Sequence, residues 1–140
     1  MEIRSYQPED HLALISLWAA IFRDHPLHNE PARAIEAKIK VDRLLFVAID
    51  GKELIGSVMA GYDGHRGWLY TAAVAPRVRR RHVGSKLVQH AISHLRALGC
   101  VKVNLQVRSN NSSVVAFYKT LGFKVEDRIS MGRLLELPDA

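Results

Sequence analysis

The sequence has very little cysteine: Cys100 is the single one among 140 residues. An internal disulfide is therefore excluded, and with it a disulfide-stabilised secreted scaffold. No apolar run reaches the roughly 20 residues that a membrane-spanning helix needs. The first residues, MEIRSY, lack the charged and apolar regions of a signal peptide. We therefore expect a cytoplasmic protein with no membrane partner.

The sequence also lacks recognisable metal-binding motifs, internal repeats and low-complexity segments. Its seven histidines show no ligand spacing of the His-Glu-x-x-His kind, so we expect no metal site. Cys100 follows a predicted helix end, which favours a buried structural thiol over a nucleophile. With 48% hydrophobic residues, the chain can bury a sizeable core, and we expect one domain over residues 1–140.

Acidic residues are absent from one stretch, residues 73–87, which holds much of the net charge of +6. Outside this stretch the basic and acidic residues nearly balance. A general nucleic-acid binder more often carries an extended basic stripe, whereas a local basic spot suits a compact polyanion. A solvated arginine cluster on an exposed turn is the alternative. The basic residues of the stretch are Arg77, Arg79, Arg80, Arg81 and Lys86.

The same stretch joins the end of a predicted strand to the start of a predicted helix. The first amides of a helix have no partner within the helix, and the helix dipole there favours negative charge. Gly84 lets the backbone approach a ligand, and Val83 can pack beneath the loop. The sequence therefore predicts a pyrophosphate cradle in a loop over residues 79–85.

Hydrophobic periodicity predicts an α/β (α+β) fold with a mixed, mostly antiparallel sheet, one central parallel strand pair and about four helices. The predicted central pair is 68–74 with 101–107, joined by the helix that follows the cradle. Asn29 or Glu30 caps the second helix. The cradle then lies at the carboxyl end of a strand, where ligands bind in such sheets. The remaining predicted strands are 3–6, 44–49, 54–62, 123–128 and 131–137.

Two motifs carry a resemblance to a known family. VAPRVRRRHVGSKL at residues 74–87 and NSSVVAFYKTLGF at residues 111–123 together resemble the GNAT superfamily of acetyl-CoA-dependent N-acetyltransferases. The segment GYDGHRG at 61–67 is similar to the YpeA-type small bacterial acetyltransferases. The resemblance implies an enzyme that moves an acetyl group from acetyl-CoA to a primary amine, on a small molecule or on a peptide or protein. It implies direct attack in a ternary complex.

The resemblance also implies roles for individual residues. An N–H near Ala73 or Val74 would polarise the thioester carbonyl, and Tyr118 would protonate the departing thiolate. Asn111 would contact the cofactor arm. The remaining cofactor-binding residues are those that pair with pantetheine, Ala72 with Ala73 and Val74, and those that hold the pyrophosphate: Arg79, Arg80, Arg81, His82, Val83, Gly84 and Ser85.

The sequence departs from the family pattern at several positions. His82 stands where the loop usually has its first glycine, and Arg80 stands where glycine is common. Gln106 occupies the position of a glutamate base in some relatives, and glutamine cannot accept a proton at useful pH. The general base is left open between Asp63, His65, Glu126 and water.

Other functions remain open at this stage. Residues 77–81 could instead bind a polyanion such as RNA, although nucleic acid is the less favoured partner. A third hypothesis is a CoA-binding sensor without catalysis. The acceptor amine is not named by the sequence, although the loops 25–29, 63–66 and 126–131 would shape its site. A homodimer is left open.

Overall fold

The computed structural model describes residues 1–22 and 29–136. These residues form two compact parts, 1–106 and 107–136. The first part holds a five-stranded sheet, and the second holds one helix with the segments on either side of it.

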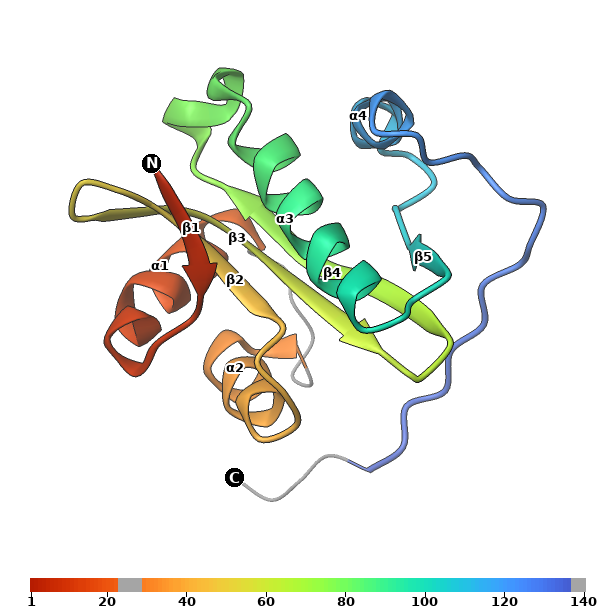
Figure 1. The fold of residues 1–140 in the computed structure, drawn as a ribbon, viewed down its shortest axis with the longest axis horizontal. Coiled ribbons are helices and arrows are strands. Elements are labelled where there is room, and N and C mark those ends of the chain that lie inside the picture. The colour runs from red at the N-terminus through yellow and green to blue at the C-terminus, as the bar shows by residue number, and fades with distance from the viewer. Residues whose placement is uncertain (23–28, 137–140) are drawn as a thin grey trace. The chain divides into compact units, whose positions relative to one another are not determined.

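The sheet has the order β1-β2-β3-β4-β5 (Figure 1). Neighbouring strands are antiparallel except β4 and β5, which are parallel. The mixed, mostly antiparallel sheet expected from the sequence is therefore confirmed. The strands are β1 Glu2–Ser5, β2 Leu45–Asp50, β3 Glu53–Tyr62, β4 Arg66–Val74 and β5 Lys102–Leu105.

Three α-helices accompany this sheet: α1 His11–Ile21, α2 Pro31–Ile39 and α3 Val83–Ala97. Glu30 is the cap of α2, since its carboxylate accepts hydrogen bonds from the N–H groups of Ala32 and Arg33 at 3.3 and 3.0 Å. This resolves the open choice between Asn29 and Glu30. Gly99 follows the end of α3 with a left-handed φ of 97°, a conformation in which glycine commonly ends a helix.

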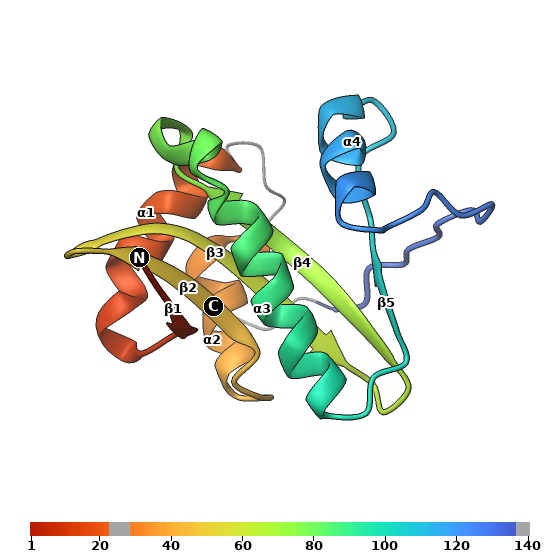
Figure 2. The same ribbon diagram turned by 45° about the horizontal axis from the view of Figure 1, so that its top comes forward.

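The helices cover both faces of the sheet (Figure 2). On the α1 and α2 face, the indole N–H of buried Trp18 donates to Ser57 Oγ over 2.8 Å. On the α3 face, a Cβ added to Gly56 would lie 2.9 Å from Leu87 Cδ1, so the helix packs directly on the strand backbone. The core beside α1 and α2 consists of Tyr6, Leu14, Leu17, Trp18, Ile35, Leu45, Val47 and Ala73.

An ion pair fastens β1 to the start of α1. The Arg4 guanidinium donates to both carboxylate oxygens of Asp10, at 2.7 and 3.0 Å, and the Gln7 N–H donates to Asp10 Oδ2 at 2.8 Å. Burial alone would raise the pKa of Asp10, but these hydrogen bonds hold it below its usual value. The carboxylate therefore remains charged in the folded protein.

The second part contains α4, Ser112–Thr120. Asn111 caps it, since Asn111 Oδ1 accepts from the Val114 N–H at 3.3 Å. Gly122 follows with a left-handed φ of 92°. Glycine in this conformation commonly ends a helix.

The two predicted strands after this helix are wrong for the residues that the structure describes. Residues 123–136 contain no strand, and the side chains of Val125, Ile129 and Met131 are 73%, 90% and 91% exposed. Hydrophobic alternation gives a strand tendency, but a strand forms only when a neighbour accepts its hydrogen bonds. Here the Arg128 N–H donates to Glu126 O within the same segment. Without these strands, the parallel pair lies at one edge of the sheet and not at its centre. Residue 137 lies outside the described residues, and the single-domain organisation stays a prediction.

Candidate active site

A bulge interrupts β4 halfway along its pairing with β3. Ser57 pairs with Ala73 and Met59 pairs with Tyr70, so one residue of β3 faces two of β4, Thr71 and Ala72. Thr71 has a φ of 46°, which is unusual for a β-branched residue. Such bulges re-aim strands beside functional sites, and a residue in this conformation costs about 1–3 kcal/mol.

Beyond the bulge, the outer edge of β4 is open. The parallel partner β5 pairs with β4 only as far as Leu69, so residues 70–74 have no neighbouring strand on that side in the described chain. The Ala75 N–H donates to Ile55 O of β3 at 2.8 Å. Because peptide groups alternate along a strand, the N–H and C=O of Val74 point to the open edge. Its carbonyl accepts from Arg79 Nε over 3.4 Å, on that side.

The basic stretch after β4 has more regular secondary structure than the sequence predicts. The predicted loop over 79–85 is wrong, because residues Pro76–Arg81 form a 3₁₀ helix and α3 starts at Val83. Proline fixes the first dihedral of the turn, and the buried side chains of Val78 and Val83, 3% and 1% exposed, hold it on the core. The predicted packing of Val83 beneath this segment is confirmed.

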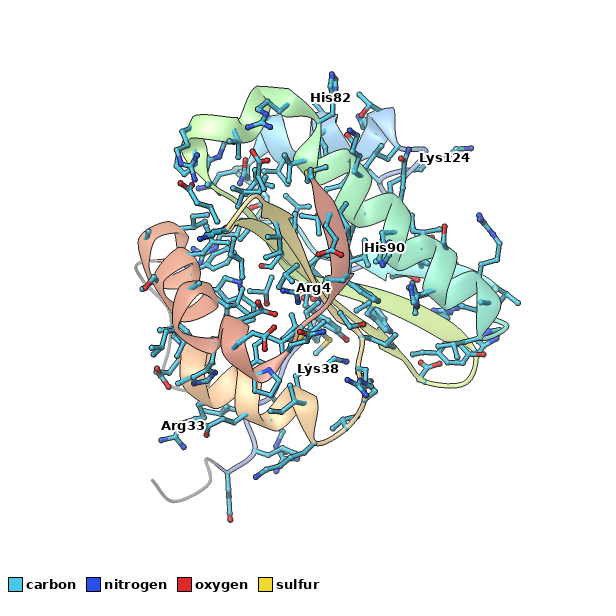
Figure 3. All side chains as sticks on the ribbon, turned by 60° about the vertical axis from the view of Figure 1, so that its left-hand side comes forward. Arg4, Arg33, Lys38, His82, His90 and Lys124 are labelled. Carbon is cyan, nitrogen blue, oxygen red and sulfur yellow. The ribbon has the colours of Figure 1, made fainter. Side chains whose placement is uncertain are left out.

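His82 connects the two helices in the left-handed conformation, with φ 59° and ψ 23°. Its exposed side chain points outward (Figure 3). The first bond of α3 runs from the Lys86 N–H to His82 O at 3.1 Å. The N–H groups of Val83, Gly84 and Ser85 therefore precede the helical ladder, at the positive end of the dipole. This is the geometry of an anion site.

Acidic residues distant in the sequence neutralise part of the basic stretch. Arg81 pairs with Asp50 at 3.0 Å, and Arg77 pairs with Glu53, both in or beside the β2–β3 turn. Arg79 contacts the Val74 carbonyl, as described above. The side chain of Arg80 lies outside the described residues. Arg77, Arg79 and Arg81 are thus engaged by other groups of the protein, whereas the N–H groups of residues 83–85 lie ahead of the first helical bond of α3.

Tyr118 and Asn111 belong to the second part of the chain, residues 107–136. Tyr118 is 8% exposed, with the rings of Phe117 and Phe123 centred 5.0 and 5.5 Å away. Burial raises the pKa of its phenol, so the hydroxyl is protonated at neutral pH and can donate. Asn111 uses Oδ1 as the helix cap, and its contact with a cofactor stays a prediction.

The base candidates differ in their surroundings. Asp63 Oδ1 accepts from the N–H groups of His65 and Arg66 at 2.9 and 2.7 Å, and these bonds hold the pKa of Asp63 below its usual value. A carboxylate that binds protons this weakly is a poor base near neutral pH. His65 is exposed in the same turn, and Glu126 lies in the second part.

A cavity of about 410 Å³ lies on the α2 side of β3 and β4. Its apolar lining includes Met59, Tyr62, Trp68 and Tyr70, and Asp63 lies among its polar residues. Sequence analysis missed this cavity. The available signal was the spacing of Trp68 and Tyr70, since alternate residues of a strand share one face.

Comparison with known proteins gives a family. Residues 11–123 match the acetyltransferase (GNAT) family. The chain belongs to this family. It is 38% identical over 136 residues to acetyltransferase ECA0875 of Pectobacterium atrosepticum, covering 96% of each chain. It is 37% identical over 139 residues to acetyltransferase SG1711 of Sodalis glossinidius, covering 97% of each.

Solved structures of GNAT-like proteins share the fold. Ard1 from Thermoplasma volcanium superposes with a TM-score of 0.79 at 23% identity, over 89% of this chain and 83% of that one. Aminoglycoside N-acetyltransferase AAC(6')-Iy in complex with CoA has a TM-score of 0.80 at 20% identity, over 95% and 93% of the two chains. The expectations of a GNAT fold and of an acetyl-CoA-dependent acetyltransferase are thereby confirmed at the level of the family.

Two further findings, one on membrane-spanning helices and one on metal-binding groups, concern residues 1–22 and 29–136. No helix there is both long and apolar enough to cross a membrane. His, Cys, Asp and Glu side chains do not gather there in groups of three or more that could hold a metal ion.

Proposed function

We propose that this chain transfers the acetyl group of acetyl-CoA to a primary amine, by direct attack of the amine in a ternary complex. One observation carries the proposal. The N–H of Val74 points to the open edge of β4, and the free amides of residues 83–85 follow shortly after in the same chain. Acetyl-CoA is an extended ligand with a thioester at one end of its pantetheine arm and a diphosphate at the other. It therefore needs hydrogen-bond donors at two separate places, in the order in which Val74 and residues 83–85 supply them.

The alternation of peptide groups along β4 favours Val74 over Ala73 as the thioester donor. Ala73 pairs with Ser57 and, like Ala75, directs its N–H toward β3. The pantetheine arm would add to β4 along Ala72–Val74. The pyrophosphate would bind the amides of Val83, Gly84 and Ser85, with Arg79, Arg80, Arg81 and His82 around it.

In the reaction, the neutral amine attacks the thioester carbonyl carbon, and a C–N bond forms. The Val74 N–H would donate to the oxyanion that develops, and one such donor is typically worth roughly 3 kcal/mol of barrier. The C–S bond then breaks. The thiolate, with a pKa of about 8.5 in free thiols, takes a proton from Tyr118. The proton lost by the amine goes to His65, Glu126 or water, with Asp63 the weakest candidate.

Removal of the Val74 N–H tests this proposal directly. Val74→Pro deletes the donor, and Val74→Ala is the matched control that trims the side chain but keeps the N–H. We expect kcat to fall about 100-fold in the proline variant and less than about threefold in the alanine variant. CoA affinity, measured by isothermal titration, should change little in either. Equal kcat in the two variants would remove Val74 from the mechanism.

Tyr118→Phe tests the proposed acid. We expect turnover to fall about tenfold with nearly unchanged CoA affinity, because a thiolate leaving group needs only modest protonation. Released thiol measures turnover, and titration calorimetry measures affinity. Unchanged turnover would leave Tyr118 with a packing role alone.

The RNA-binding hypothesis and the CoA-sensor hypothesis predict different results when the protein is titrated with RNA and with CoA. An RNA-binding module would bind RNA and not CoA, and the pairing of Arg77 and Arg81 with carboxylates weighs against it. A CoA-binding sensor would bind CoA and release no thiol with any amine.

A further inference from the structure

The cavity beside α2 is built from aromatic rings on alternate positions of β4. Trp68 and Tyr70 stand opposite Gly61 and Met59 of β3. A Cβ added to Gly61 would lie 3.3 Å from Tyr70 Cε2, so the tyrosine ring lies over the bare glycine backbone. Tyr62 also borders the cavity, but its hydroxyl lies 3.6 Å from a Cβ built on Gly99, beside the end of α3, so its ring does not belong to this aromatic wall.

The lining of the cavity holds one positively charged residue and two negatively charged ones. Lys38, on α2 (Figure 3), is paired with Asp42 at 2.8 Å, so these two charges largely cancel. Asp63 remains, and its turn hydrogen bonds keep it ionised. Burial raises the pKa of the Tyr70 phenol, and the nearby charge of Asp63 raises it further. The lining therefore combines electron-rich rings with a net negative charge.

We propose that this cavity binds an ammonium group of the acceptor other than the one that is acetylated, so that the acceptor is a linear di- or polyamine. The inference rests on the proposed function and extends it to a substrate class. Cations bind over aromatic faces, and Trp68 and Tyr70 offer two such faces on one side of β4. A carboxylate at the rim adds attraction and selects against anionic acceptors.

The distance along β4 fits this acceptor. Four residues separate Tyr70 from Val74, and a strand rises about 3.3 Å per residue, so the cavity and the thioester donor lie roughly 13 Å apart along the strand. The bulge at Thr71 and Ala72 shortens this span. An extended triamine such as spermidine covers a comparable distance, whereas a short monoamine reaches only one of the two sites.

Binding can be measured without acetyl-CoA through tryptophan fluorescence. The chain has two tryptophans, and Trp18 is 2% exposed and bonded to Ser57. We expect spermidine to quench wild-type emission and leave the Trp68→Phe variant, which keeps Trp18, unchanged. Asp63→Asn should weaken spermidine binding at least fivefold. Glu9→Gln removes the same charge from an exposed position outside the cavity and should leave it unchanged. Equal weakening by both variants, or quenching that persists in Trp68→Phe, would overturn the inference.

Turnover gives the second test. With acetyl-CoA, kcat/KM should be at least tenfold higher for spermidine than for hexylamine, and Tyr70→Ala should abolish this preference by raising KM for spermidine. Thiol release that does not distinguish the two amines would overturn the inference while the proposed function stands. Spermidine quenching without thiol release from any amine would instead overturn the proposed function and leave cation binding by the cavity intact.

Discussion

The α1 face of the sheet and the outer edge of β4 are built differently. On the α1 face, polar groups that enter the core are matched: Trp18 bonds to Ser57, and Asp10 bonds to Arg4. At the β4 edge, backbone donors are open and the chain is strained. The two non-glycine residues with positive φ in the described chain are Thr71, within β4 at 46°, and His82, just before α3 at 59°. One region is optimised for stability, and the other keeps unfavourable geometry where the proposed cofactor would bind.

The largest effect on stability is expected in the first region. Trp18→Ala should lower the free energy of unfolding by about 3–5 kcal/mol, because it empties a core site and leaves Ser57 without its donor. Leu12→Ala on the same helix is the control, since Leu12 is 77% exposed and should change stability by less than about 0.5 kcal/mol. Urea denaturation measures both. Similar losses would contradict the assigned core.

A smaller loss is expected for the ion pair. Asp10→Asn should cost about 2 kcal/mol at neutral pH, since it removes the charge from two charge-assisted bonds. The folded pKa of Asp10 lies below its unfolded value, so its stabilisation is present above an unfolded pKa of about 3.9 and is lost as pH falls through the folded pKa. Between pH 7 and pH 2, the free energy of unfolding should fall less steeply in the variant than in the wild type, as measured by denaturation at each pH. Parallel curves would contradict this account.

The smallest effect is expected at the strained edge, and its sign is opposite. His82→Gly should raise the free energy of unfolding by up to about 1 kcal/mol, because glycine adopts the left-handed conformation without steric cost. Gln89→Gly, in the interior of α3, should lower it by about 1 kcal/mol. Thermal denaturation of both variants measures the difference. If His82→Gly instead lowers the free energy of unfolding, the histidine side chain stabilises the fold by more than its left-handed backbone destabilises it. CoA titration of the same variant measures whether the histidine helps to hold the pyrophosphate.

Sequence patterns predicted most of the elements of the fold. Hydrophobic periodicity predicted the helix that follows the basic stretch, and it predicted strands at 44–49, 54–62, 68–74 and 101–107, where the structure has β2, β3, β4 and β5. Residues 123–136 show the limit of such patterns, because they alternate like a strand but form no strand in the structure. The cofactor residues on β4 and α3 were predicted through the family motif. Their roles stay predictions, to be tested by the variants above.

The sequence by itself determined the elements and the family, because helix periodicity, strand alternation and the two motifs depend on residues close together in the chain. Only the tertiary structure decided which way the Val74 N–H points, which carboxylates pair with Arg77 and Arg81, and that Trp68 and Tyr70 line a cavity with Asp63. These features depend on strand register and on contacts between distant residues. Register sets the direction of every peptide group and side chain, and no local pattern in this sequence specifies it.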